Sequence, residues 1–200
     1  MKDVIILDIG KEEIKPSDTE FCARMGKPCR VSDFPCEREK IFNNITPRAA
    51  FLKVPLKIDG NITDLSVFKT ESCALRRVLL GCDFAVIFAI TLGASCDRVI
   101  RQGAYKSRLC EFVLDAMAST YAEALCDRCE EKIVEILNKS EPVVSACRFS
   151  VGYSDLPLSL QADILSALCG SRTLGISLSD SFLMTPSKSV SAIMGIKRKC

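Results

Sequence analysis

The sequence predicts an α+β fold in which a mainly antiparallel sheet is packed with helices. Three observations lead to this class. Residues 84–91 are almost continuously apolar, as in a strand buried on both faces, and residues 107–138 carry the three-and-four spacing of a long amphipathic helix. Strands and helices also follow one another without regular β-α-β alternation. No linker rich in Pro, Gly or Ser divides the 200 residues, which suffice for one good-sized core, so one domain or a closely fused pair is expected.

In the first half of the chain, the sequence predicts some elements clearly and others poorly. Residues 1–50 form a divergent, charged and Pro-interrupted segment with one short strand at 4–7, which either completes the same fold or contacts a partner. The main α+β domain is expected to span residues 51–200, its first strand running over 50–58 and ending at the turn-forming Asp59-Gly60. A helix capped by Thr70 and stopped by Gly81 follows, with its apolar face at Leu75, Val78 and Leu79.

In the second half of the chain, the predicted helices and strands are clearer. Gly93 ends the buried strand, and a short helix leads to the long one. After Pro142 we expect an extended segment at 143–149, a turn, a helix at 158–168 stopped by Gly170, and strands near 174–180 and 189–196. The long helix should bury one stripe, formed by Leu109, Phe112, Val113, Met117, Tyr121, Leu125, Cys129, Ile133 and Ile136.

Composition excludes several classes of function. The 27 basic and 25 acidic residues leave a net charge of +2, which gives no electrostatic reason to expect nucleic acid. The absence of histidine excludes a His base and a His ligand to zinc or cobalt within this chain. The longest apolar run, residues 84–94, is about half of the roughly 20 residues that a membrane span needs. Asp8 interrupts the N-terminal apolar run, so no secretory signal or membrane is expected, and the location should be cytoplasmic.

Twelve cysteines allow two interpretations. Without an export signal they are expected to be reduced, and Cys73, Cys110, Cys126 and Cys169 are expected on apolar helical faces. The alternative is a cysteine-ligated zinc or iron-sulfur protein, with candidate ligands at Cys22, Cys29 and Cys36 and a further pair in the run CDRC at 126–129. The seven-residue spacing of the three candidates lacks the usual C-x2-C knuckle, so no metal is assigned.

The run RFSVGYSDLP at 148–157 carries the most specific chemistry. Arg148 could donate a fork of hydrogen bonds to a carboxylate, Gly152 permits close backbone approach, and Tyr153 could cover an apolar or aromatic group. The alternative is a surface turn in which Arg148 makes an ordinary ion pair and Tyr153 packs under the loop.

A resemblance favours the first interpretation. RFSVGYSDLP is similar to the Arg-Pro-Ala-Pro-Gly-Tyr signature of the S-adenosylmethionine-binding activation domain of vitamin B12 (cobalamin)-dependent methionine synthase. Residues 178–196, LSDSFLMTPSKSVSAIMGI, resemble the second signature of that domain, which runs from a Thr-Glu-Ser-Phe-like start to Ser-Val-Ser. The order and separation of the two motifs also match, and the resemblance covers about residues 70–196. The chain therefore looks like a free-standing relative of this domain.

The resemblance implies a set of site residues. Arg148 would contact the carboxylate of S-adenosylmethionine, the backbones of Ser150 and Gly152 would line the ligand, and Tyr153 would lie near the cofactor-facing side. The family's ligand-contacting tyrosine falls on Met194, which leaves a backbone contact there. Glu123 matches a helix glutamate of the family, although it also fits a solvated charge at the edge of the helix.

The resemblance also implies a function in trans. The chain would be the activation subunit of a cobalamin-dependent methionine synthase that lacks its own activation domain. It would bind S-adenosylmethionine so that cob(II)alamin on the partner is remethylated after reduction, with a flavodoxin-type protein as candidate reductant. Phe149 and Val151 replace two prolines of the family's loop and remove two φ constraints. The departures at Val151 and Met194 leave a module that keeps the fold without the ligand as a further alternative.

Overall fold

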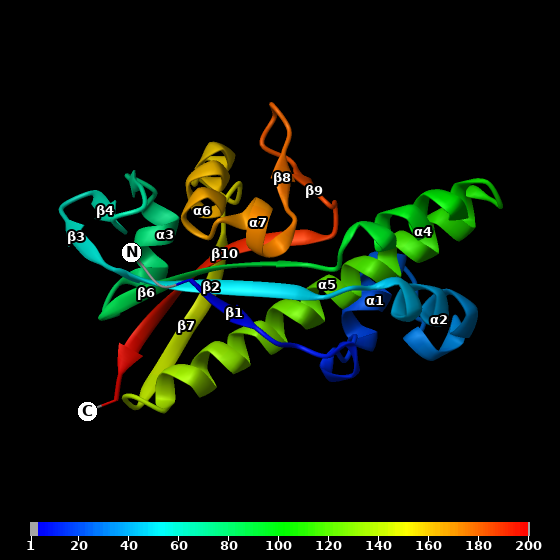
Figure 1. Ribbon diagram of the computed structural model, residues 1–200, viewed down its shortest axis with the longest axis horizontal. Helices are drawn as coiled ribbons and strands as arrows, with labels where there is room; N and C mark the ends of the chain where they lie inside the picture. Colours follow the sequence, from blue (N-terminus) through cyan, green and yellow to red (C-terminus); the bar gives the residue numbers. More distant parts are fainter. Residues whose placement is uncertain (1–3, 200) are drawn as a thin grey trace.

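The computed structural model describes residues 4–199. Its centre is a five-stranded sheet of order β1-β2-β6-β10-β7, in which every neighbouring pair is antiparallel (Figure 1). This confirms the α+β class with a mainly antiparallel sheet. The strands are β1 (Ile5–Leu7), β2 (Arg48–Pro55), β6 (Phe84–Thr91), β7 (Val143–Ser150) and β10 (Ser189–Arg198).

Strand β6 is the middle of the sheet, as its continuous apolar sequence predicts. All eight of its residues are buried, and it pairs along its whole length with β2 on one side and β10 on the other. Its side chains alternate between two cores: Phe84 and Phe88 belong to one cluster, and Ile87 to the other. The sheet is therefore covered on both faces.

One face is covered by the long helix α5 (Arg108–Asn138), which crosses the sheet and projects beyond it beside α4 (Ala94–Ala104; Figure 1). The expected long helix is confirmed, and Ser107 caps it by accepting a hydrogen bond from the Cys110 N–H. The buried stripe is wrong at its first turns. Leu109 is 67% exposed and Phe112 48% exposed, because this end of α5 reaches past the sheet edge.

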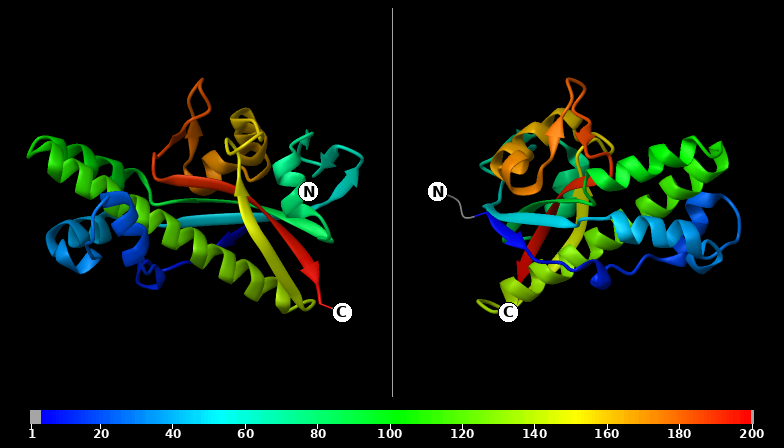
Figure 2. Two further views of the ribbon diagram at one scale, coloured as in Figure 1. Left: turned by 180° about the vertical axis from the view of Figure 1, so that it is seen from behind. Right: turned by 45° about the vertical axis from the view of Figure 1, so that its right-hand side comes forward.

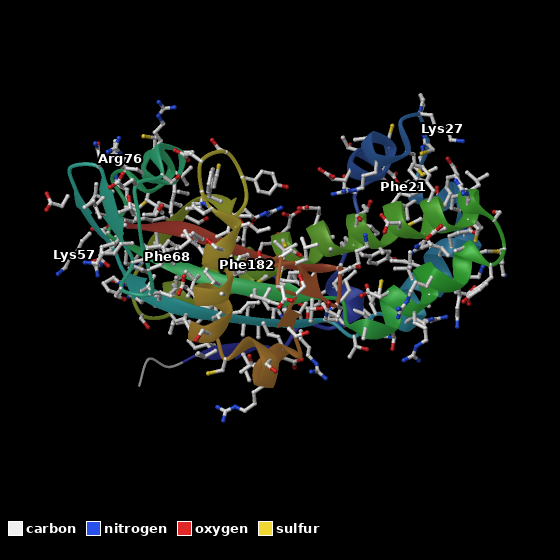
Figure 3. All side chains as sticks on the ribbon, turned by 90° about the horizontal axis from the view of Figure 1, so that it is seen from above. Phe21, Lys27, Lys57, Phe68, Arg76 and Phe182 are labelled. Atoms are coloured by element: carbon white, nitrogen blue, oxygen red, sulfur yellow. The ribbon has the colours of Figure 1, made fainter. Side chains whose placement is uncertain are left out.

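The N-terminal segment also packs on α5. Helices α1 (Asp18–Met25) and α2 (Pro35–Asn44) contact it, and Phe21 of α1 is fully buried against it (Figure 3). A 3-10 helix, η1 (Lys11–Glu13), is held beside α5 by Glu13, which accepts hydrogen bonds from Lys132 and Arg128. The described part of the first fifty residues thus shares the α5-side core.

The opposite face carries the shorter elements, seen on the other side of the sheet in both views of Figure 2. The expected cap of α3 (Cys73–Leu79) is wrong by two residues, since Ser72 rather than Thr70 accepts the hydrogen bond from the Leu75 N–H. The helix expected at 158–168 is formed by η3 (Leu158–Leu160) and α6 (Gln161–Ala167); it ends before Gly170, which is the first residue of α7 (Gly170–Leu174). The elements of this face are α3, η3, α6 and α7.

Two small sheets, one of three strands and one of two, flank this layer. The first strand of the domain ends at Pro55 rather than at residue 58, because β3 (Lys57–Asp59) turns away to pair with β4 (Ile62–Asp64), which in turn pairs with β5 (Lys69–Thr70). The expected turn at Asp59-Gly60 joins β3 to β4. Strands β8 (Ser177–Leu178) and β9 (Met184–Thr185) form a second hairpin that stands away from the main sheet (Figure 1).

The cysteines only partly follow the expectation of buried thiols. Cys126 is buried and Cys110 half-buried, but Cys73 and Cys169 are exposed, because they lie at the first position of α3 and just before α7 rather than on an apolar helical face. Every cysteine from residue 4 to 199 is a free thiol, and Cys200 lies outside the described residues. Over the same range, the structure has no helix long and apolar enough to cross a membrane.

Candidate ligand-binding site

The turn after β7 is closed by its own backbone. The Gly152 N–H donates to the Leu156 carbonyl at 2.9 Å, and the Leu156 N–H donates to the Tyr153 carbonyl at 3.1 Å. Gly152 has φ +83°, and a Cβ there would come within 3.0 Å of Leu158 Cδ1. The turn therefore requires glycine at this position, both for its dihedral angle and for its close packing.

Asp155 ties the turn to helix α3. Its carboxylate accepts hydrogen bonds from the Ser72 hydroxyl and from the N–H groups of Cys73 and Ala74, the latter two at 2.7 and 3.3 Å. These bonds, the Ser72 one first, lower the pKa of Asp155. The N–H groups are two of the unpaired donors at the start of α3, so one side chain both caps the helix and anchors the turn.

A cavity of about 390 Å³ lies between this turn, helix α5 and the start of β10. Four of the six sequence-predicted site residues line it: Glu123, Arg148, Ser150 and Tyr153. They come from α5, from the end of β7 and from the turn. The remaining lining residues were not predicted as site residues: Phe149, Val151, Gln161, Met184, Ser189, Val190 and Ser191.

The other two candidates are not among the lining residues. Gly152 shapes the turn beside the cavity, as its contact with Leu158 shows. Met194 is fully buried in the α5-side core, directly opposite Arg148 in the pairing of β10 with β7. Tyr153 is 68% exposed, so it stands at the mouth of the cavity and does not pack under the loop.

Arg148 is held by three carboxylates of α5. Its Nη1 donates to Asp127 Oδ1 at 2.7 Å and to Glu130 Oε1, and its Nη2 donates to Glu123 Oε2 at 2.7 Å. The acidic residues are spaced by four and three, which places them on one face of the helix. The pair with Glu123 links Arg148 to a residue that also lines the cavity.

The cluster is partly withdrawn from water. Burial raises the pKa of Glu130, and the hydrogen bond from Arg148 opposes this effect. Arg24 of α1 adds a second cation, its Nη2 lying 3.6 Å from Glu123 Oε1. A guanidinium has five N–H donors, and the contacts with α5 use three of them, which leaves donor capacity at Nε and Nη2 for a ligand.

The β10 side of the cavity is lined by buried polar groups. Gln161 is 5% exposed and bridges two elements, donating from Nε2 to the Phe182 carbonyl at 2.8 Å and accepting at Oε1 from the Ser191 hydroxyl at 3.2 Å. The Ser189 hydroxyl donates to the Pro186 carbonyl at 2.7 Å and lies 2.8 Å from Thr91 Oγ1. These polar atoms are therefore satisfied and fixed in position.

Some of the additional lining residues could have been predicted from the sequence, and others could not. Ser189 and Ser191 are the serines of the Ser-Val-Ser motif, so the motif itself could have indicated them. Gln161 carried no local signal, since a polar residue at the start of a helix is ordinary. Met184 is likewise brought to the cavity by the β8–β9 hairpin, which no spacing in the sequence foretells.

The cysteine-ligated alternative finds no matching geometry. Within residues 4–199, no group of three or more His, Cys, Asp or Glu side chains is arranged to hold a metal ion. Cys36 is exposed, Cys22 donates to the Lys27 carbonyl, and burial raises the pKa of Cys29, which disfavours the thiolate that a metal needs. Cys126 and Cys129 are buried inside α5, where burial also raises their pKa values.

The fold and the cavity define a class of protein: an antiparallel sheet between two helical layers, with a small-molecule-sized pocket built on a Gly-Tyr turn. The family model described as "Vitamin B12 dependent methionine synthase, activation domain" matches residues 79–200, more than half of the chain. The chain therefore belongs to this family, which confirms the resemblance seen in the sequence.

One solved structure similar to this chain is the MetH reactivation domain bound to AdoHcy (S-adenosylhomocysteine). The TM-score is 0.68 at 17% sequence identity, and the match covers 97% of this chain and 78% of that one. At this identity the likeness shows a shared fold. No curated protein matches the sequence.

Proposed function

We propose that the chain binds S-adenosylmethionine in the cavity beside Arg148 and acts as an activation subunit of a cobalamin-dependent methionine synthase. One observation carries the proposal: in a chain of this family, the fold brings Glu123, Arg148, Ser150 and Tyr153 around a single cavity. Its volume of about 390 Å³ is within the range of roughly 300–1,000 Å³ that small-molecule sites occupy.

The lining chemistry fits the parts of this ligand. The remaining donors of Arg148 suit a carboxylate, and Glu123, which is about a third exposed, suits an ammonium or sulfonium charge. Ser150 ends β7, so its backbone borders the cavity, and the ring of Tyr153 can cover the ligand from the mouth. Arg148, Ser150, Gly152, Tyr153 and Glu123 are the proposed site residues, with Met194 contributing only through the strand that supports Arg148.

The partner is proposed from the family. A cobalamin carried by a methionine synthase chain would accept the methyl group from the sulfonium sulfur of the ligand held here, leaving S-adenosylhomocysteine in the cavity, once a flavodoxin-type donor has supplied one electron to cob(II)alamin. Binding and orientation of the methyl donor are this chain's contribution. A cytoplasmic location, where such partners would be met, is part of the proposal.

Titration calorimetry with S-adenosylmethionine tests the proposal. Arg148→Ala should weaken binding by about 1.5–3 kcal/mol, the range for a hydrogen bond to a charged group. Arg101→Ala, at an exposed position on α4, is the matched control and should leave the affinity unchanged. Unchanged affinity in Arg148→Ala would remove this residue from the site, and absence of binding to the wild type, both alone and with the partner's cobalamin-binding module present, would overturn the proposal.

A ligand-free module is the second candidate, and one observation favours it. The three carboxylates on Arg148 compete with any ligand carboxylate for the same guanidinium. In a ligand-free module, Arg148 would only hold β7 against α5 through its ion pairs. Repeating the titration with the partner's cobalamin-binding module present separates the two candidates, because a module that lacks the ligand site binds S-adenosylmethionine in neither experiment.

A further inference from the structure

The cavity continues from one face of the sheet to the other around the end of β7. The pairing of β7 with β10 ends where Ser150 lies opposite Ala192, and Ser191 borders the cavity just past this point. Arg148 faces the α5 side, whereas Gln161 comes from α6 on the opposite face. Along β10, the positions opposite Arg148 and beside Gln161 are three residues apart, roughly 10 Å at the usual strand rise.

An elongated ligand with two unlike ends fits such a cavity. The α5 end offers the guanidinium of Arg148 and the carboxylate of Glu123, which suit an amino-acid group. The α6 end offers the amide of Gln161 with the thioether side chain of Met184 near it in the lining. An amide combined with apolar surface suits a planar heterocycle that carries hydrogen-bonding groups on its edge.

The orientation of the Gln161 amide is set by its two partners. The Phe182 carbonyl can only accept a hydrogen bond, so the amide nitrogen must face it, at 2.8 Å. The amide oxygen is then on the side of Ser191, whose hydroxyl must donate. Phe182, labelled in Figure 3, belongs to the connection between β8 and β9, so Gln161 also ties that hairpin to α6.

This arrangement leaves the amide with one further donor and one further acceptor. A primary amide has two N–H groups and two acceptor lone pairs, and each kind is used once here. Adenine presents a matching pair, an amino donor beside a ring-nitrogen acceptor, and glutamine amides recognise this edge with two hydrogen bonds. Gln161 is only 5% exposed, so its amide would make these bonds largely shielded from bulk water, which strengthens them.

We propose that Gln161 is the specificity-determining residue for the base of a nucleoside ligand, its side-chain amide reading the amino group and adjacent ring nitrogen of adenine. The inference rests on the proposed function, because it assigns the base end of the same cavity. Recognition of the N6 edge of the base is chemically independent of the proposed methyl transfer, because neither the methyl group nor the amino acid affects that edge.

The wild-type protein provides the first test. S-adenosylhomocysteine and S-inosylhomocysteine differ in the N6 amino group, which is a carbonyl oxygen in the inosyl compound. Calorimetric titration should show the adenosyl compound binding at least tenfold more tightly, because the inosyl edge leaves the buried amide mismatched. Equal affinities would overturn this inference and leave the proposed function standing. If neither compound nor S-adenosylmethionine binds, either alone or with the partner's cobalamin-binding module present, both are overturned.

Two variants locate the discrimination. Gln161→Leu should reduce the adenosyl-to-inosyl preference to less than about threefold, whereas Gln102→Leu, at an exposed glutamine of α4, should keep the full preference. A ratio of affinities does not change through a general loss of folded protein, so this readout is independent of stability. Wild-type preference in Gln161→Leu would refute the assignment, and the wild-type comparison stands even if the variant fails to fold.

Discussion

Replacing Arg148 by methionine should destabilise the fold by an amount set by its three carboxylate partners. Arg148→Met keeps a long apolar stem and removes the guanidinium. Glu130, which is 21% exposed, loses a hydrogen bond to a charged group, worth about 1.5–3 kcal/mol. Glu123 and Asp127 are 35% and 66% exposed and lose ion pairs worth about 0.2–1 kcal/mol each.

These contributions share one side chain and do not simply add, so we expect a loss of about 2–4 kcal/mol in the free energy of unfolding. Urea unfolding followed by circular dichroism at pH 7 measures it, with Arg101→Met on α4 as the control. For a chain of this length the corresponding drop in Tm is roughly 5–15 °C. The unfolding slope should stay the same, because no new surface is exposed in either state.

A second variant tests the electrostatic reasoning. Because Arg148→Met leaves Glu130 charged and half-buried without a partner, adding Glu130→Gln should recover about 1 kcal/mol of the loss. The deficit should also shrink as the pH falls. Burial raises the pKa of Glu130, so the penalty for its charged form is absent below the unfolded pKa and grows as the pH rises through the folded value. A loss below 0.5 kcal/mol, or one that Glu130→Gln does not reduce, would refute the reasoning.

Three further predictions concern stability and thiol chemistry. Gly195→Ala should cost about 1–3 kcal/mol of unfolding free energy, since its Cβ would come within 2.5 Å of Cys82 Sγ, and Cys82→Ala in the same chain should restore most of it. Glu13→Gln should cost about 1 kcal/mol above pH 5 and nothing near pH 2, because its hydrogen bond with Lys132 lowers the pKa of Glu13 to about 2; paired urea melts at the two pH values would contradict this if the cost were constant. Thiol titration with Ellman's reagent should be fast at the exposed cysteines and should need denaturant at three buried positions, Cys96, Cys126 and Cys129, where burial raises the thiol pKa; fast labelling of these three would contradict their burial.

The sequence predicted the features of the fold that depend on a local pattern of residues. The apolar run of β6 and the spacing along α5 identify the two longest buried surfaces, and the turn at Gly152 follows from residues adjacent in the chain. The prediction failed at the first turns of α5, because periodicity gives the apolar face of a helix without showing where its supporting sheet ends. Leu109 is on the correct stripe and still exposed for this reason.

The site was predictable only where its residues lie close together in the sequence. Arg148 and Tyr153 lie within one motif, but the partners of Arg148 lie 18–25 residues away on another element. Acidic residues at i, i+4 and i+7 on α5 were a visible signal for a cation facing that helix. Helices α1 and α2 were missed because short, charged helices gain their stability from packing on α5, which their own sequences do not reveal.

The pairing of β2 with β6 shows that the folded domain extends beyond the residues that match the family. The match begins at Leu79, whereas β2 lies at 48–55 and forms a complete eight-residue ladder with β6. A fragment trimmed to the matched region would present β6, an entirely apolar strand, as an open edge ready to pair with another chain. What sequence similarity delimits is thus a shared signature, while the smallest piece that can be studied in solution must reach back at least to Arg48.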